Sequence, residues 1–498
     1  MTIQYDNFNN RITVVSSAAD APLVLQPKGT GPLQAQLTDS TATGGNTRGA
    51  NAVDWQTSRS AANQVSSGTG TTLSGGVQNV ASNAYTSVGG GVSNGASGFA
   101  GVVSGGWNNY ATGNQSVVSG GYTNTSSGLY GNILGGQSNT AAGIYNIIGG
   151  GFTNTGTANA AVTTQSATMN ATTAVTLSGS NASIKVGQYI TGTSIAGDTY
   201  VAAISGTSLT LSKVASGSST STLSFYTPHG VVVGGGNNQA TGSYSFIGGG
   251  GDAGTAANRN VASGDWSTVG GGVKNVASGL GSAVVGGGLD SAGNISGNTS
   301  SGASAVICGG RGHTASGNES TVLGGAASTA NGLASMVQGR TATTRGITGN
   351  VVFAGSYSPI SGGGSSQLAF LVLARQTTDA TPIVLTNDGG AASTTNQVVL
   401  PNNSAYYFRG EVISGVTGGG NTKGWFIEGV IKRGANAAST ALVGTPTVTS
   451  MYADVGAATW AIAVTADTTN GGLAVTFTGQ ASTTIRTVAQ IRTTEMTY

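Results

Sequence analysis

The acidic residues of this chain are too sparse to supply an obvious hydrolytic pair. Only 16 of the 498 residues are Asp or Glu, and none lies in residues 56–197. Hydrolysis of a glycosidic bond needs two carboxylates about 5 to 9.5 Å apart. Acids at the turns of a repeat are usually solvated, and of those in the repeat region only Asp252 and Asp265 could approach each other. The others there are Asp290 and Glu319. We therefore expect no catalytic residue and no enzymatic activity.

The two histidines and the single cysteine are also too few for a metal centre or a nucleophilic site. His313 falls at a repeated position that is Asn in most copies, where a histidine can replace the amide as a hydrogen-bonding group. His229 stands alone, and Cys308 aligns with Ser104 and Ser119 as a small buried residue. Only three His313 side chains meeting on a symmetry axis would offer several metal ligands. We expect no metal and no cofactor.

Side chains suited to binding a surface ligand occur near the end of the chain. Residues 347–498 combine charged and aromatic side chains on alternating, strand-like segments. An outward-facing Trp or Tyr beside polar groups is suited to stacking against a sugar. We expect Glu411 and Glu428 to form salt bridges with nearby basic side chains such as Arg409. The receptor-binding candidates are Trp425, Lys432, Arg433, Tyr452 and Trp460.

These side chains must be positioned by a repetitive fold, because much of the chain repeats every 15 residues. Glycine accounts for 86 of the 498 residues, and only 7% are charged. One copy, residues 109–122, reads NYATGNQSVVSGGY. Most Gly-Gly pairs are followed by an Asn three residues after the second Gly. The same spacing places Gln64, Gln239, Asp290, His313, Ser328 and Thr343 in the Asn position.

Each repeat offers one Asn, one β-branched residue and one small residue to an interior, which is too little to fold alone. Stacked copies would bury continuous ladders, as in a solenoid. Fifteen residues suit two short strands, with Gly-Gly and the Gly of Ala-Ser-Gly supplying corners of positive φ. Stacked Asn side chains can hydrogen-bond along their column. The predicted Asn ladder comprises Asn79, Asn94, Asn109, Asn124, Asn139, Asn154, Asn260, Asn275 and Asn298. The predicted aliphatic ladder comprises Val88, Val103, Val118, Ile133, Ile148, Val269, Val284, Ile307, Val322 and Val337.

The sequence therefore predicts an all-β chain of five segments. Residues 1–45 form an N-terminal attachment or cap segment. Residues 46–156 and 227–346 form the two halves of a parallel β-roll or solenoid, with residues 157–226 as an inserted small β domain. Residues 347–498 form a C-terminal antiparallel β-sandwich of jelly-roll type. A coil of 15 residues has a thin core, so we expect three chains to associate as a homotrimer.

The repeat resembles the head repeats of trimeric autotransporter adhesins, which are left-handed parallel β-rolls. SVVSGG at residues 116–121 and STVLGG at residues 320–325 correspond to their SVAIG-like strands, although Gly-Gly after the strand departs from that pattern. The chain is also similar to bacteriophage tail fibre proteins, in which segments like NTRGANAVDWQTSRSAANQVSSG, residues 46–68, lead into Gly-rich repeat shafts. The resemblance covers roughly residues 25–346.

The resemblance implies a structural tail fibre that is part of the virion and exposed to the extracellular medium. Residues 1–45 would bind other tail, baseplate or adaptor proteins, and residues 347–498 a host cell-surface glycan or outer-membrane receptor. A net charge of +2 gives no reason to expect nucleic acid as a partner, and no apolar run approaches the roughly 18 residues of a membrane span.

Two alternatives remain open. One is a capsule or lipopolysaccharide depolymerase, a tailspike enzyme that would lower the viscosity of a polysaccharide solution. The other is the head of a bacterial trimeric adhesin. We would expect an adhesin to carry a signal peptide, coiled-coil heptads and a membrane barrel, and we find none of these patterns in the sequence.

Overall fold

The computed structural model describes residues 2–6, 11–15, 27, 29–156, 161–197, 199–226, 230–355 and 363–498. The chain divides into two compact units, residues 1–120 and 121–498, and each is described by itself. The described residues contain no α-helix; their helical turns are the 3-10 segments η1 (Ala256–Asn258), η2 (Ala437–Ser439) and η3 (Val455–Ala457). None of these is long and apolar enough to span a membrane. The predicted all-β class is confirmed.

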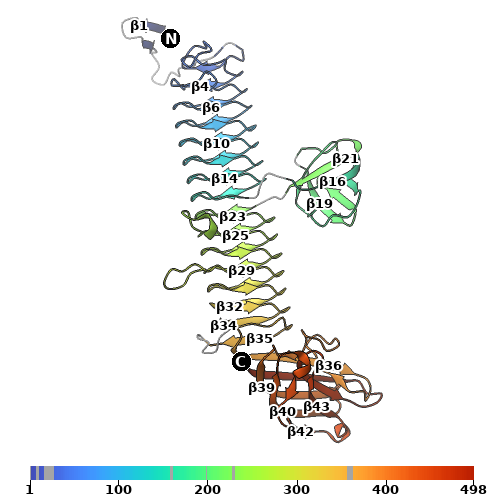
Figure 1. Cartoon of the computed structure of the whole chain (residues 1–498). Helices are drawn as coiled ribbons and strands as arrows, with labels where there is room; N and C mark the ends of the chain where they lie inside the picture. The colour runs from blue at the N-terminus through green and yellow to red at the C-terminus, as the bar shows by residue number, and fades with distance from the viewer. Residues whose placement is uncertain are drawn as a thin grey trace. The chain divides into compact units, whose positions relative to one another are not determined.

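Both units contain a parallel β-solenoid whose coils stack strand on strand (Figure 1). Most coils contribute one two-residue strand to each of two sheets and a single bridge residue to a third face, as in the bridged row Val77, Val92 and Trp107. The first residue of a strand faces outward and the second inward, so Val88 and Ala96 are fully buried. The solenoid core is therefore one aliphatic column and one column of small residues.

In residues 1–120, the hairpin β1 (Thr2–Asp6) and β2 (Arg11–Val15) precedes the solenoid. The aliphatic sheet contains β3 (Leu33–Gln34), β4 (Val53–Asp54), β5 (Thr72–Leu73), β7 (Ser87–Val88), β9 (Val102–Val103) and β11 (Val117–Val118). The small-residue sheet contains β6 (Val80–Ala81), β8 (Gly95–Ala96) and β10 (Tyr110–Ala111). Parallel pairing thus begins at β3, inside the segment predicted to be an N-terminal cap.

In residues 121–498, the same two sheets recur with more coils. The aliphatic sheet contains β13 (Asn132–Ile133), β15 (Ile147–Ile148), β22 (Val231–Val232), β24 (Phe246–Ile247), β26 (Thr268–Val269), β28 (Ala283–Val284), β30 (Val306–Ile307), β32 (Thr321–Ala326) and β34 (Met336–Arg340). The small-residue strands are β12 (Thr125–Ser126), β14 (Thr140–Ala141), β23 (Gln239–Ala240), β25 (Val261–Ala262), β27 (Val276–Ala277), β29 (Thr299–Ser300), β31 (Thr314–Ala315) and β33 (Thr329–Ala330).

The Asn side chains bind backbone groups at one corner of each coil. The backbone N–H of Asn94 donates to Oδ1 of Asn79 at 2.9 Å, and Asn94 Nδ2 donates to the carbonyls of Gly90 and Gly106 at 2.9 and 2.8 Å. Asn275 makes the same three bonds in the second unit. The nine predicted Asn side chains are at most 1% exposed, and the ten predicted aliphatic residues are fully buried. An amide fits this position because it combines one acceptor with two donors.

Two positions that the spacing assigned to the Asn column lie outside it. Gln64 Oε1 accepts from the backbone N–H of Ser60 and Ala61, and Gln56 takes the ladder position before Asn79. After the insertion the column resumes at Asn238, whose backbone N–H donates to Asn154 Oδ1. Gln239 is the next residue, on β23. The repeat spacing therefore assigned the Asn position to the residue that follows the correct one.

Asp290 is the third such position, and it belongs to a loop. The backbone N–H of Asn298 donates directly to Asn275 Oδ1, 23 residues earlier in the chain. Asp290 instead accepts hydrogen bonds from the backbone N–H groups of Ala292 and Asn294, which close the loop. The extra residues therefore leave the solenoid without breaking the column.

The glycines have two distinct roles, and one differs from the prediction. Gly91 of a Gly-Gly pair has a φ of 84°, as predicted. Gly98 of Ala-Ser-Gly does not have a positive φ. The corner lies two residues later, at Ala100, which has a φ of 52°. Tyr130, two residues after Gly128, has a φ of 58° in another copy of the repeat. A Cβ atom on Gly98 would lie 1.9 Å from the carbonyl oxygen of Gly113. Glycine is needed there because adjacent coils approach closely.

The inserted segment forms a closed six-stranded antiparallel barrel with its own core. Its strands are β16 (Ala161–Asn170), β17 (Ala174–Leu177), β18 (Tyr189–Thr191), β19 (Thr199–Ser205), β20 (Ser208–Leu211) and β21 (Ser218–Tyr226). The strand order is β16-β17-β20-β19-β18-β21. Met169, Leu209 and Phe225 are fully buried in this core. A module closed in this way has no free sheet edge.

The C-terminal region is a sandwich of two antiparallel sheets. The larger has the order β35 (Val351–Ala354), β36 (Ser366–Thr377), β45 (Ile485–Thr497), β39 (Ser404–Val416), β40 (Thr422–Arg433), with β41 (Ala441–Leu442) and β42 (Thr447–Ala453) both paired to β40. The smaller contains β37 (Ile383–Val384), β38 (Val398–Val399), β43 (Ala461–Asp467) and β44 (Gly472–Thr478). Because β34 pairs with β35, the solenoid's aliphatic sheet continues into the larger sheet.

Candidate functional site

The Asp side chains of the repeat region bind backbone groups of their own loop or of the neighbouring coil. Asp252 accepts hydrogen bonds from Asn258 and from the backbone N–H of Gly254 at 3.0 and 2.8 Å, and these bonds lower its pKa. Asp265 accepts from the backbone N–H of Ser243 at 3.1 Å. Within the described residues, no group of three or more His, Cys, Asp or Glu side chains is arranged to hold a metal ion.

His313 and Cys308 differ in where their side chains lie. His313 is 1% exposed inside the coil, where its Nδ1 accepts from the backbone N–H of Ser328 at 3.1 Å. A ring held there cannot reach a symmetry axis outside the coil. Cys308 is exposed, contrary to the prediction that it is buried, because it follows the inward-facing Ile307 and so points out of the sheet.

Two of the five receptor-binding candidates are core residues. Trp425 is 5% exposed and Trp460 2% exposed. Both pack edge-on against Phe477, with ring centroids 6.2 and 6.3 Å apart. Lys423 packs beside this cluster, and its Nζ donates to the carbonyl of Trp460 at 2.7 Å. We therefore remove Trp425 and Trp460 from the receptor-binding candidates. The alternation of side chains along the strands did not show which face of the larger sheet is covered by the smaller one.

The other three candidates reach the surface to different extents. Arg433 is half-buried, and its Nη1 donates to the carbonyl of Leu400 at 2.5 Å. Lys432, the preceding residue of β40, is exposed. Tyr452, on β42, is 80% exposed. Tyr452 and Lys432 are thus the candidates whose side chains are free to contact a large ligand.

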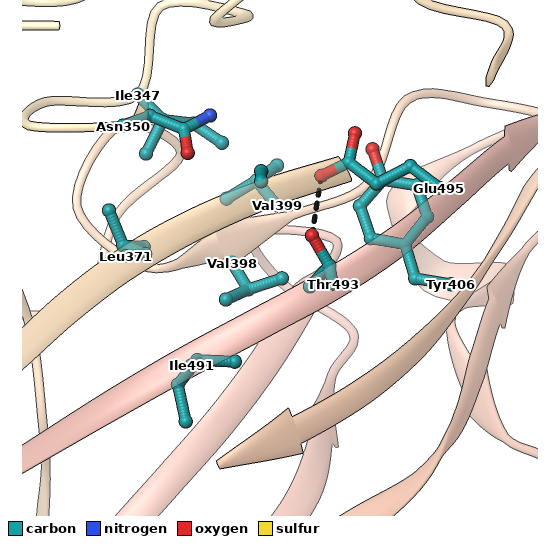
Figure 2. A pocket seen from close by; sticks show the side chains of 10 residues that line it. Ile347, Asn350, Leu371, Val398, Val399, Tyr406, Ile491, Thr493 and Glu495 are labelled. Atoms are coloured by element: carbon teal, nitrogen blue, oxygen red, sulfur yellow. Dashed lines mark hydrogen bonds between the residues drawn. The ribbon is translucent and has the colours of Figure 1, made fainter. Parts of the chain in front are cut away.

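A small cavity lies where the last solenoid coil meets the sandwich (Figure 2). Its lining includes Ile347, Tyr406, Thr493 and Glu495, and it offers about 10 Å³ to a water-sized molecule. That is about the space of one water molecule. Glu495 accepts from Thr493 Oγ1 and from Gln367 Nε2, both at 2.8 Å. The cavity is therefore too small for a sugar.

The polar groups beside this cavity join two parts of the fold. The guanidinium of Arg345, which follows β34, forms an ion pair with Glu495 of β45 and donates to the hydroxyl of Tyr406 on β39. Burial, followed by the charge of Glu495, raises the pKa of Tyr406 well above its usual value. The phenol therefore stays neutral, and the cluster has a structural role. The sequence analysis missed it because its members are far apart in the chain.

A shallow groove of about 310 Å³ lies on the outer face of the larger sheet. Its lining includes Phe370, Arg409, Glu411, Gln490 and Arg492. The guanidinium of Arg409 lies 4.9 Å from the ring centre of Phe426, and that of Arg492 lies 6.0 Å from the ring centre of Phe370. The predicted salt bridges of Glu411 and Glu428 are not formed within the described chain.

The far edge of the same sheet is open. All seven residues of β42 are exposed. Met451 is 53% exposed, and Val455, just beyond the strand, is 96% exposed. An edge strand that is uncovered on both faces offers backbone and side-chain groups together to a partner. Tyr452 lies near the end of β42, next to Met451 on this apolar and hydroxyl-bearing edge.

No protein-family model matches this chain, and no curated protein matches it. Solved structures similar to it include bacteriophage tailspikes. The tailspike of Acinetobacter phage vB_ApiP_P1 is 10% identical, with 90% of this chain and 82% of that chain covered and a TM-score of 0.20. The tailspike of Acinetobacter baumannii phage AM24 is 7% identical, with 93% and 78% covered and a TM-score of 0.20.

A third similar structure concerns the expectation about catalysis. The tailspike gp49 of Acinetobacter baumannii bacteriophage Fri1 is 8% identical, covers 84% of this chain and 79% of its own, has a TM-score of 0.16 and is described as a capsular polysaccharide depolymerase. The prediction that this chain is not an enzyme is contradicted by this finding, and we withdraw it. We transfer no residue role from these structures.

Proposed function

We propose that this chain is a tail fibre or tailspike protein of a tailed bacteriophage and that the β42 edge of its sandwich contacts the host surface. The observation that carries the proposal is the position of β42 in the sheet. The solenoid joins the larger sheet at β35, and β42 is at the opposite edge, fully exposed. A spacer that ends in an open binding edge is the arrangement that attachment at a distance requires.

The chemistry of the edge favours an uncharged polysaccharide as its ligand. Tyr452 offers a ring for stacking, and Met451 and Val455 extend the apolar surface. Thr447, Thr449 and Ser450 add hydroxyl groups, and β42 carries no charged residue. Sugars present both apolar faces and hydroxyl groups, so a Tyr with polar neighbours is suited to binding them.

The remaining parts of the proposal follow the sequence resemblance. Residues 1–45 bind other tail, baseplate or adaptor proteins, and the protein resides in the virion tail. Three chains form the fibre, so weak binding at each edge is strengthened by several simultaneous contacts. Lys432 remains a candidate contact residue, and the half-buried Arg433 is a weaker one.

The first test is binding of the purified chain to a panel of bacterial capsular and lipopolysaccharide glycans. We expect Tyr452→Ala to weaken binding by roughly 2- to 12-fold, because an aromatic stacking contact contributes about 0.5–1.5 kcal/mol beyond the buried area. Tyr498→Ala is the matched control, because Tyr498 is also exposed, at 72%, but lies outside β42. Equal binding by Tyr452→Ala and the unaltered chain would contradict the proposed edge. Size-exclusion analysis of the recovered glycan would show in the same samples whether it is cleaved.

A further inference from the structure

One row of outward-facing side chains runs continuously from the solenoid onto the sandwich. Consecutive pairings place Phe246, Thr268, Ala283, Val306, Thr321, Met336 and Val351 in register. Val351 is then opposite Phe370, Phe370 opposite Arg492, Arg492 opposite Arg409, and Arg409 opposite Glu428. The aliphatic sheet and the larger sandwich sheet therefore share one outer face, which we call the continuous face.

The solenoid part of the continuous face is apolar. Side chains two residues apart share a face of a strand, so the exposed aliphatic and aromatic residues beside and within this row belong to it. These are Leu134, Ile147, Val233, Phe246, Val285 and Leu323, each 38% to 59% exposed. Isolated apolar residues are common on protein surfaces, but a file of them along one face marks an interaction site.

The two other faces of the solenoid in residues 121–346 differ from it. The outward residues of the small-residue sheet are mostly Thr and Ser, as in Thr299, Ser301, Thr314 and Ser316. The third face carries two loops. One follows the bridge residue Gly251 and contains Asp252, and the other follows Gly288 and contains Asp290. Of these three faces, as far as residues 121–346 are described, the continuous face alone is both apolar and free of these loops. Further exposed apolar side chains, Trp266, Leu280 and Leu333, lie on a corner of the coil.

The sandwich part of the continuous face adds charges of both signs. Val372, Ile413 and Val488 are 58%, 59% and 43% exposed there. Arg409 lies directly opposite Arg492 in the sheet, and like charges in this position are destabilising. Glu411 and Glu428 share the face, and none of the four forms a salt bridge within the described chain.

We infer that the continuous face is the surface through which copies of this chain associate. Arg409, Arg492, Glu411 and Glu428 place charges of both signs at the centre of this face, with Lys432 and Arg486 nearer the strand ends. A second copy brings the same mixture of charges, so each sign can find its opposite across the contact. Association brings each copy's arginines near another copy's glutamates and covers the apolar file. The inference rests on the proposed fibre function, which requires assembled chains, and it specifies the face that they use.

Sedimentation equilibrium of the full chain tests this inference. We expect the unaltered chain to have a mass of at least twice the 48.4 kDa of one chain. Phe246→Lys combined with Val285→Lys should reduce it to a single chain, because both side chains point outward on the apolar file. Thr314→Lys, on the Ser/Thr face of the same solenoid, is the control and should leave the mass unchanged. Circular dichroism would verify that each variant keeps its β structure.

Charge reversal provides an independent arm. Arg409→Glu with Arg492→Glu should weaken association, and adding Glu411→Arg with Glu428→Arg to the same chain should restore it. A single-chain mass for the unaltered protein would overturn the inference, as would dissociation by Thr314→Lys but not by the Phe246 and Val285 changes. Glycan binding by the dissociated variant is measured separately. Because Tyr452 is on β42 and not among the altered residues, loss of assembly and loss of the proposed function give different results.

Discussion

His313 shows what the ladder requires of a single side chain. Its Nδ1 takes the acceptor role of the Asn oxygen, but its Nε2 can donate only one hydrogen bond, and the carbonyl of Gly325 beside it does not receive one of full geometry. The Asn residues at this position donate two hydrogen bonds through Nδ2. Nδ1 can accept only while it is unprotonated. Burial lowers the pKa of His313 below its usual value of 6.5, which keeps the ring neutral.

We predict that His313 makes the solenoid less stable in mild acid. A histidine whose pKa is lower in the folded state binds protons more readily when unfolded, so the stability present above pH 6.5 is lost as the pH falls through the folded pKa. His313→Asn should remove this dependence and add about 1 kcal/mol, since it restores a donor hydrogen bond. Guanidinium unfolding of both proteins at pH 7.5 and 5.5 would measure it. Equal losses of stability in both would show that His313 is not responsible.

At the scale of the element, the distance between coils controls which glycines are replaceable. A Cβ atom at Gly302 would lie 2.1 Å from the carbonyl oxygen of Gly317 in the next coil, whereas one at Gly309 would meet nothing within 4 Å. Neither residue has a positive φ. The two glycines therefore differ in packing, and neither is needed for a left-handed backbone conformation.

This difference gives a paired prediction. Gly302→Ala should destabilise the solenoid by about 1–3 kcal/mol, the usual cost of overpacking. Gly309→Ala should be neutral or stabilise by up to about 1 kcal/mol, because alanine restricts the unfolded chain. Denaturant midpoints of the two variants would decide. If both lost stability equally, close approach of the coils would not be the reason for the glycine.

The same scale shows how far the sequence could predict this structure. The 15-residue period located the aliphatic column, because most copies place Val or Ile at the same offset from Asn. It failed at Gln64, Gln239 and Asp290, where loops or an insertion change the spacing and only hydrogen bonding decides which residue enters the column. For the candidate site, alternation identified strands but not which face the smaller sheet covers. Trp460 was therefore placed on the surface although it is buried.

At the scale of the whole molecule, long-range contacts fix the joint between solenoid and sandwich in residues 121–498. The Arg345–Glu495 ion pair connects residues 150 positions apart, with side chains only 12% and 4% exposed. Gln367 fastens the same joint, because its Nε2 donates to Glu495 and its Oε1 accepts from the backbone N–H of Thr343. A buried ion pair is costly to break from one side, since the remaining charge is left without a partner.

We therefore predict that Glu495→Gln lowers stability by about 3–5 kcal/mol, the usual cost of stranding a buried charge. Replacing both partners, as Arg345→Met with Glu495→Gln, should recover part of that loss, because no unpaired charge then remains. Glu319→Gln, an exposed carboxylate on a solenoid corner, is the control and should change stability by less than about 0.5 kcal/mol. Guanidinium unfolding followed by the fluorescence of the buried Trp425 and Trp460 would report on the sandwich side of the joint. If the double variant were no more stable than Glu495→Gln, the loss would come from the carboxylate's other hydrogen bonds, and the ion pair would not be what couples the two parts.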